Sequence, residues 1–179
     1  MLRVFPIAAP ARFSDDFGYI RSEGAKPHAG IDIFADEGSP LVAVDAGQVR
    51  FGQDPIGGNI ANLYAEDGTR YYYAHLYAFA GGGPRSVEAG EVIGYVGDTG
   101  NAQGGPPHVH FEEHPGNGAA VNPHAGLLAA AHSSAGSRSG GPSAGKVVLA
   151  IGLLGALAFA VGPTIDKAMK QAARSPRTS

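Results

Sequence analysis

Histidine and aspartate residues form two closely spaced groups in this chain of 179 residues. His28 and Asp32 lie four positions apart, and His108 and His110 lie two positions apart. Imidazole and carboxylate groups can bind a divalent ion such as zinc, and imidazole also exchanges protons near neutral pH. The chain has no Cys, which excludes thiolate metal sites, disulfides and a cysteine nucleophile. Any metal site must therefore be built from His and carboxylate.

Both groups are expected on β-strands rather than on helices. Gly30 and the β-branched Ile31 and Ile33 disfavour a helix around the first group. In a strand, alternate side chains share a face, so the two polar residues of each group point the same way. The intervening apolar residues then point into a core. The pattern predicts two polar clusters on one face of a sheet.

His75 is a third candidate for the same site. It belongs to an aromatic run, RYYYAHLY, at residues 70–77. Strict alternation places it on one face with Tyr71, Tyr73 and Tyr77. Alone it would be interpreted as a surface or half-buried residue of an aromatic strand. Beside the two other groups it is better interpreted as part of the site.

The elements that position these residues are predicted to be short strands. From residue 41 to 96, β-branched and aromatic runs alternate with Gly and Asp, which is typical of strands and turns. The turn at 66–69 contains Asp-Gly, so 59–65 and 70–77 should pair as an antiparallel hairpin. No helical periodicity occurs before residue 122. The prediction for residues 1–130 is a compact, mainly β domain that ends with a short helix.

The C-terminal part of the chain has a different composition. Residues 131–146 are rich in Ser and Gly, which is typical of a linker. Residues 147–165 are uncharged and, as a helix, would extend roughly 28 Å, close to the thickness of bilayer hydrocarbon. Residues 166–179 form a basic tail. The sequence thus predicts one C-terminal hydrophobic, transmembrane helix after the linker.

Charge is distributed unevenly between the two parts. Residues 1–126 carry 7 Lys and Arg against 15 Asp and Glu, whereas residues 127–179 carry 6 against 1. An acidic domain lacks the clustered cations that bind phosphate, so no nucleic-acid partner is expected. Four Lys or Arg follow 147–165 and two precede it, which favours a cytoplasmic C-terminus and an external β domain. The oligomeric state is left open.

The motifs, taken together, resemble the lysostaphin-type (LytM-like) zinc metallo-endopeptidases. They occur in family order over roughly residues 10–126, and residues 121–123 resemble the segment that closes that domain. The matching segments are His28-Ala-Gly-Ile-Asp32, Gly38-Ser-Pro-Leu-Val-Ala-Val44, Gly47-Gln-Val49, Tyr73-Ala-His75-Leu76, Val87-Glu-Ala-Gly-Glu-Val-Ile-Gly94, Gly97-Asp-Thr-Gly100 and Pro107-His108-Val-His110-Phe-Glu112.

This resemblance implies a compact antiparallel β domain whose groove acts on peptides of peptidoglycan. It implies that His28, Asp32 and His110 hold Zn²⁺, while His75 and His108 assist catalysis. We expect His108 to be the general base toward water and His75 to donate a hydrogen bond to the oxyanion, although the two roles could be exchanged. The alternative is a non-catalytic module that binds peptidoglycan or a partner; the presence of all five residues favours an enzyme.

The expected location is a membrane anchor through 147–165, with the catalytic domain on the peptidoglycan side. The N-terminus lacks the unbroken apolar run of a secretory signal peptide. A phage virion or its membrane is therefore the alternative location. Among the remaining candidates, Glu112 could orient a ligand imidazole, and His114 is expected at the surface.

Overall fold

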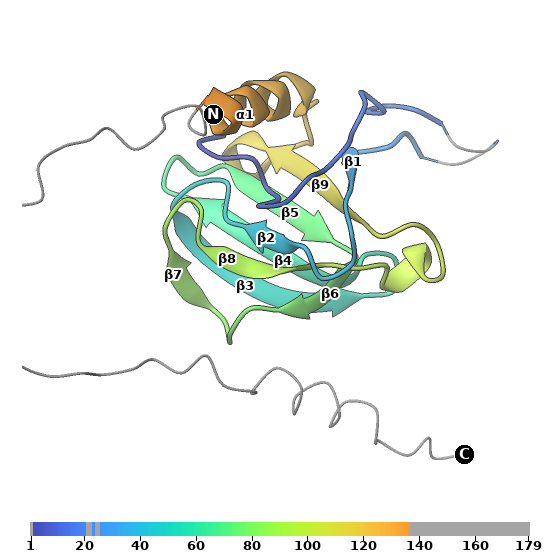
Figure 1. Cartoon of the computed structure of the whole chain (residues 1–179), viewed down its shortest axis with the longest axis horizontal. Coiled ribbons are helices and arrows are strands. Elements are labelled where there is room, and N and C mark those ends of the chain that lie inside the picture. Colours follow the sequence, from blue (N-terminus) through green and yellow to red (C-terminus); the bar gives the residue numbers. More distant parts are fainter. Residues whose placement is uncertain (1, 21–22, 24–25, 137–179) are drawn as a thin grey trace, which may run out of the picture. The chain divides into compact units, whose positions relative to one another are not determined.

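The computed structural model describes residues 2–20, 23 and 26–136, which fold mainly as β-strands (Figure 1). All strand pairs are antiparallel, as the sequence predicts. The strands are β1 (Ile31–Phe34), β2 (Pro40–Val42), β3 (Gly47–Asp54), β4 (Gly58–Ala65), β5 (Arg70–Ala74), β6 (Leu76–Phe79), β7 (Arg85–Val87), β8 (Val92–Val96) and β9 (His108–His114). The helices are the 3-10 turns η1 (Gly100–Ala102) and η2 (Pro115–Asn117) and the α-helix α1 (His124–Gly136).

The larger sheet has six strands in the order β1-β9-β5-β4-β3-β7. The predicted hairpin is confirmed: β4 pairs with β5 across residues 66–69, with Leu63 opposite Tyr71. Gly68 adopts a φ of 83° at this turn, and Asp67 Oδ1 accepts a hydrogen bond from the Thr69 N–H at 2.8 Å. The Asp-Gly pair therefore forms the turn for the reason that the sequence suggests.

The predicted strand at 70–77 is divided in two by His75. β5 ends at Ala74 in the six-stranded sheet, whereas β6 begins at Leu76 in a second sheet of order β2-β8-β6. His75 has a φ of 66°, in the left-handed region that non-glycine residues rarely adopt. This conformation ends the alternation of β5 and redirects the chain from one sheet to the other.

The hydrophobic core lies between these two sheets. Tyr71, Tyr73 and Phe111 contribute its largest fully buried side chains from the six-stranded sheet, and Leu76 and Ile93 contribute from the smaller one. The Tyr73 hydroxyl donates to the Val42 carbonyl at 3.2 Å and accepts from the Val44 N–H at 3.1 Å. This buried tyrosine thus attaches the two layers to each other by polar contacts as well as by packing.

Helix α1 begins after Asn122, whose side-chain oxygen accepts a hydrogen bond from the His124 N–H at 2.9 Å. Leu127 and Ala130 are buried in the core. The helix continues past the expected domain end at residue 130 to Gly136, within the segment predicted as a linker. Its alanine-rich sequence favours continuation, and the Ser133 hydroxyl donates to the Ala129 carbonyl at 3.1 Å.

The remaining predictions for the C-terminal part, at 137–146, 147–165 and 166–179, lie outside the described residues. Within residues 2–20, 23 and 26–136, no helix has the length and apolar character needed to cross a bilayer.

Candidate metal centre

The site is built on β1, β9 and β5, which are neighbours in the six-stranded sheet. Asp32 on β1 and Ala74 on β5 both lie opposite His110 on β9. Residues that face each other across an antiparallel pair project to the same side of the sheet. The alternate residues Val109 and Phe111 are fully buried on the other side. The predicted polar face is therefore confirmed for β1 and β9.

The prediction that His28 lies on one strand with Asp32 is wrong, because β1 begins only at Ile31, and His28 reaches the site from the segment that precedes it. Its backbone pairs with an N-terminal loop: Gly18 donates to the His28 carbonyl at 2.8 Å, and His28 donates to the Tyr19 carbonyl at 3.0 Å. Gly30 then runs against β9 so closely that a Cβ there would collide with the carbonyl of Phe111. Glycine at this position lets the chain deliver His28 beside Asp32.

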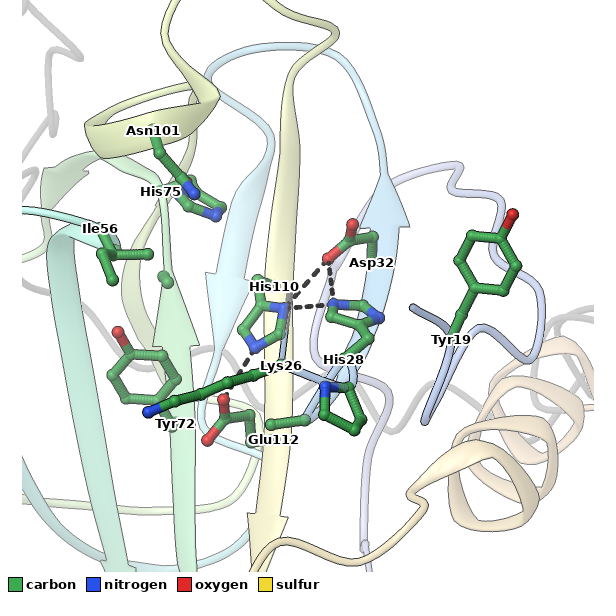
Figure 2. Close-up of a pocket in the computed structure, with 14 residues that line it drawn as sticks. Tyr19, Lys26, His28, Asp32, Ile56, Tyr72, His75, Asn101, His110 and Glu112 are labelled. Atoms are coloured by element: carbon green, nitrogen blue, oxygen red, sulfur yellow. Dashed lines mark hydrogen bonds and ion pairs between the residues drawn. The ribbon is translucent and has the colours of Figure 1, made fainter. Parts of the chain in front are cut away.

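Three ligand atoms converge at the site, as Figure 2 shows. His28 Nε2 lies 2.8 Å from His110 Nδ1 and 3.2 Å from Asp32 Oδ1. His110 Nδ1 lies 3.1 Å from the same carboxylate oxygen. Ligands at 2.0–2.1 Å from a tetrahedral zinc ion are separated by about 3.3 Å. The three observed separations are close to that value, so the donor set fits a zinc ion.

The opposite nitrogen of each ligand imidazole faces an oxygen acceptor. His28 Nδ1 donates to the Asp16 carbonyl at 3.1 Å, and His110 Nε2 donates to Glu112 Oε1 at 2.8 Å. A neutral imidazole that donates through one nitrogen presents a lone pair at the other. These outer hydrogen bonds fix the tautomers, so both lone pairs point to the common centre, as metal ligation requires.

The pKa of His110 is shifted by the carboxylate oxygens of Asp32 and Glu112 that contact its ring. Burial on its own lowers the pKa of His110, but the hydrogen bonds to Asp32 and Glu112 outweigh it and raise the pKa to about 9. For Glu112, burial raises the pKa, and the hydrogen bonds from His110 and His114 reverse this and lower it. The side chains around the centre thus favour positive charge at the position where three ligand atoms meet.

His75 borders the same site, but not in the way that alternation predicts. Tyr71 and Tyr73 are fully buried in the core, whereas His75 lines the pocket together with Tyr72. The prediction that His75 shares a face with Tyr71 and Tyr73 is wrong, because the left-handed backbone at His75 turns its side chain to the other side. The His75 Nδ1–H donates to the Thr99 carbonyl at 2.8 Å.

His108 stands beside His75, and their ring centroids are 4.9 Å apart. Its Nδ1–H donates to the Pro106 carbonyl at 2.9 Å, and its Nε2 lies 3.9 Å from Asp32 Oδ2. Both imidazoles therefore use Nδ1 to hold their orientation through a backbone carbonyl. In each neutral ring, Nε2 carries the lone pair and can accept a proton.

The three ligand residues lie in a pocket of about 480 Å³ (Figure 2). The pocket is also lined by Tyr19, Lys26, Ile56, Tyr72 and Asn101, and Figure 2 shows Tyr19 on the opposite side of the site from Ile56 and Tyr72. The exposed aromatic and aliphatic surfaces of Tyr19 and Ile56 flank the polar centre. This arrangement can accommodate an extended chain across the metal ligands.

Two residues near the site differ from expectation. His114 was expected at the surface, but it is buried with 8% exposure and donates to Glu112 Oε2 at 2.6 Å. The strand continues through His114, and alternation places His114 on the same face as His110 and Glu112, where it contacts the Glu112 carboxylate. Asp16 was not identified from the sequence. Its carbonyl orients His28, and no spacing pattern could link these residues because the contact joins a loop to a distant segment.

Comparison with known proteins identifies the family to which this chain belongs. Residues 26–123, more than half of the chain, match the model of Peptidase family M23. The DD-carboxypeptidase/endopeptidase Mpg of Neisseria meningitidis serogroup B is 39% identical over 116 residues, which are 63% of this chain and 26% of that protein. The glycyl-glycine endopeptidase ALE-1 of Staphylococcus capitis is 37% identical over 92 residues, 48% of this chain and 24% of that protein.

Among solved structures, the catalytic domain of the prophage-encoded M23 protein EnpA from Enterococcus faecalis superimposes with a TM-score of 0.58 at 28% identity. The match covers 68% of this chain and 95% of that domain. The chain spans about a quarter of the length of the curated relatives named above. The family match covers the three candidate metal ligands and both further histidines, and on this basis the chain belongs to peptidase family M23.

Proposed function

We propose that this protein is a zinc-dependent endopeptidase that hydrolyses peptide bonds of peptidoglycan. The observation that carries the proposal is the convergence of His28, Asp32 and His110 beside two further oriented imidazoles. Family membership supports a peptidase, and the two relatives compared above are named as endopeptidases. Two imidazoles and one carboxylate leave one position of a tetrahedral ion for solvent, as in catalytic zinc sites.

Zn²⁺ held by these three residues would acidify its bound water and polarise the scissile carbonyl. The chain must then supply a proton acceptor and a hydrogen-bond donor for the oxyanion. His75 and His108 both direct Nε2 into the site, because Nδ1 of each is engaged by a backbone carbonyl. Both side chains are thus prepared for these two roles.

The surroundings favour an exchange of the roles expected from the sequence. Burial lowers the pKa of His75 below its ordinary value, with the nearby His108 and His110 acting in the same direction. His75 is therefore neutral near pH 7, and its Nε2 can take the proton of the attacking water. His108 would donate a hydrogen bond to the oxyanion, and the proton that His75 has taken would pass from His75 to the leaving amine.

The tether and the location belong to the same proposal. Residues 147–165 would anchor the protein in a membrane, with the peptidase domain on the peptidoglycan side. The excess of Lys and Arg after this segment supports that orientation. Residence in a phage particle is the alternative, and the similar EnpA protein, which is prophage-encoded, is consistent with it.

The test compares the wild-type protein with two single substitutions that affect different functions. Full-length protein is reconstituted with Zn²⁺, its metal content is measured, and it is incubated with peptidoglycan that is cross-linked through D-alanyl bonds or through pentaglycine. Mass analysis of the soluble products identifies the bond cleaved. Wild type should bind about one zinc ion and release peptide fragments, because its three ligands match a catalytic site.

His108→Ala should retain the metal and lose hydrolysis, whereas His110→Ala should lose both. A chelator should abolish activity, and added Zn²⁺ should restore it. A wild-type protein that binds zinc but releases no fragment from either substrate would instead support the non-catalytic binding module. Normal digestion by His108→Ala would show that His108 has no catalytic role.

A further inference from the structure

The turn between β3 and β4, residues 54–58, forms one wall of the pocket. Ile56 and Gly57 from this turn line the pocket, and Figure 2 shows Ile56 across the pocket from His28 and Asp32. Asp54 organises the turn from within: its Oδ1 accepts hydrogen bonds from the Ile56 N–H at 2.9 Å and the Gly57 N–H at 2.5 Å. One carboxylate oxygen thus fixes the path of the backbone that borders the site.

The 54–58 turn holds the backbone of His75 directly. The Gly57 carbonyl accepts a hydrogen bond from the His75 N–H at 2.7 Å. His75 is in the left-handed conformation, which is costly for a residue with a side chain and persists only where surrounding contacts impose it. The hydrogen bond to Gly57 acts at the residue whose unusual φ turns the imidazole into the pocket.

The turn is also attached to the segment that holds the imidazole ring. The Ile56 carbonyl accepts from the Asn101 N–H at 2.9 Å. Two residues earlier, the Thr99 carbonyl accepts from His75 Nδ1–H. The backbone and the ring of His75 are therefore both bound to one connected unit, made of the 54–58 turn and residues 99–101.

Tyr72 connects the second oxygen of Asp54 to the strand that carries His75. Its hydroxyl donates to Asp54 Oδ2 at 3.0 Å, and its ring lies on the pocket face of β5. Burial on its own raises the pKa of Asp54, but the hydrogen bonds from Gly57, Tyr72 and Ile56 outweigh it and lower the pKa. Asp54 is thus an ionised carboxylate whose two oxygens join the turn to β5.

We propose that Asp54 is a positioning residue for hydrolysis, which acts through the Gly57 carbonyl and Tyr72 to hold His75 in its site-facing conformation. This proposal rests on the proposed function, because it assigns a role to a residue that supports a catalytic imidazole. It predicts that the Asp54 carboxylate affects turnover through His75 and leaves the three metal ligands unaffected.

The chain contains a matched control at the other end of β4. Asp67 forms the same kind of turn, because its Oδ1 accepts from the Thr69 N–H at 2.8 Å, but the 66–69 turn does not line the pocket. Loss of either carboxylate removes the side-chain hydrogen bonds that stabilise a hairpin turn. Only loss of Asp54 should disturb His75, so the comparison separates positioning from general destabilisation.

The experiment uses full-length, zinc-reconstituted protein and a defined peptide substrate that contains the bond cleaved by wild type. Asp54→Ala should lower kcat by about 10–100-fold, with KM changed by less than about threefold and zinc content unchanged, because a small displacement of a catalytic group has a large effect on turnover. Asp67→Ala should leave kcat within about twofold. Asp54→Asn should restore much of the loss, since its amide oxygen can still accept from the turn.

A double-substitution cycle tests whether the effect passes through His75. In a His75→Ala background, Asp54→Ala should change the residual rate by less than about twofold, since there is no imidazole left to position. An equal loss of rate in both backgrounds overturns the proposal. So does a loss of kcat in Asp67→Ala as large as that in Asp54→Ala.

Amide hydrogen exchange supplies a measurement that does not depend on hydrolysis. The His75 N–H should exchange faster in Asp54→Ala than in wild type or Asp67→Ala, because its acceptor on Gly57 is released. Unchanged protection of this amide refutes the positioning role even if the enzyme is active. If wild type cleaves no peptidoglycan, the proposed function fails, and the exchange result still decides whether Asp54 holds His75.

Discussion

At the scale of single residues, Glu112 connects the metal centre to a second buried imidazole. Its two oxygens accept hydrogen bonds from His110 at 2.8 Å and from His114 at 2.6 Å. His114 is attached in turn to the Gly118 carbonyl at 2.8 Å. This chain of contacts restrains the ring of His110, a candidate metal ligand, from the side away from Asp32 and His28, which is the usual way in which proteins orient metal ligands.

Replacement of Glu112 by Gln should weaken zinc binding by about 10–100-fold, because the carboxylate that fixes the His110 tautomer is lost. Competition with a chromogenic chelator measures the change in Kd. Glu113→Gln is the matched control: Glu113 is the next residue on the same strand, and it projects to the opposite face. Equal affinities for Glu112→Gln and wild type would contradict the orienting role.

The assignment of His75 as base predicts a specific dependence of activity on pH. A base must be neutral, so activity is present above its pKa and is lost as the pH falls through that value. Since burial lowers the pKa of His75 from 6.5, the acid limb of kcat/KM should lie below pH 6.5. His75→Gln should abolish this limb, whereas His108→Gln should keep it at a lower overall rate. Persistence of the limb in His75→Gln would assign it to another group.

The candidate site could be predicted from the sequence wherever short-range geometry decides it. His108 and His110 share a face because they are two residues apart on one strand, and Asp32 follows the same alternation. The contacts of Asp16 and Asp54 with the site could not be predicted, because they depend on loops that meet only in the folded chain. The sequence predicts His114 at the surface because Pro115 follows it and cannot extend the strand, yet β9 includes His114 and buries it.

At the scale of elements, two turns far apart in sequence pack backbone against backbone beside the pocket. Gly58 and Gly100 both have positive φ, of 65° and 72°. A Cβ at Gly58 would collide with the backbone nitrogen of Gly100 and the hydroxyl of Thr99. This close approach allows Thr99 Oγ1 to accept a hydrogen bond from the Asn59 N–H at 2.9 Å. Glycine here brings the 54–58 turn against the segment that holds His75.

Gly58→Ala should therefore destabilise the fold by more than about 1 kcal/mol, from both the strained backbone and the collision. Thermal unfolding should show a decrease in Tm of several degrees. Gly90→Ala is the control, because Gly90 has a φ of 87° but a Cβ there would meet no atom within 4 Å. It measures the backbone cost alone. A decrease in Tm no larger than that of Gly90→Ala would show that the turns can separate without cost.

The pairing of neighbouring strands was more predictable than their arrangement in two sheets. The hairpin of β4 and β5 follows from Asp67-Gly68 and from alternation on either side. The division of 70–77 into β5 and β6 does not follow, because it depends on a left-handed conformation at His75 that the residue type does not favour. Long-range contacts with Gly57 and Thr99 impose this conformation, so local sequence carries no signal for it.

At the scale of the whole molecule, the chain joins an acidic peptidase domain to a basic, apolar C-terminal part. The first 126 residues carry 15 acidic and 7 basic side chains, and the rest carry 1 and 6. Basic residues that flank an apolar span favour the cytoplasmic side of a membrane. The proposed tether therefore accounts for both the composition and the sign of charge after residue 126.

Truncation before Lys146 should release the protein from membranes into the soluble fraction, because residues 147–165 are then absent. Ultracentrifugation of lipid vesicles mixed with full-length and truncated protein measures the difference. The truncated protein should retain its zinc content, since all three ligands lie before residue 146. A full-length protein that stays in solution without detergent would rule out the anchor.

Strand β1 is the outermost strand of the large sheet, and it carries Asp32 while its leading segment carries His28. Four register pairs join it to β9, and among the described residues its outer side has one bridge, between Arg12 and Phe34. An ion held by His28, Asp32 and His110 would cross-link β1 and the segment before it to the neighbouring strand β9. Because binding and folding are linked, a bound metal would stabilise the pairing of β1 with β9. Any change that separates β1 from β9 would in turn lower the affinity for the metal. Inactivation by chelators and cleavage of β1 by proteases would then both report the same equilibrium, in which β1 separates from β9 and the metal is lost.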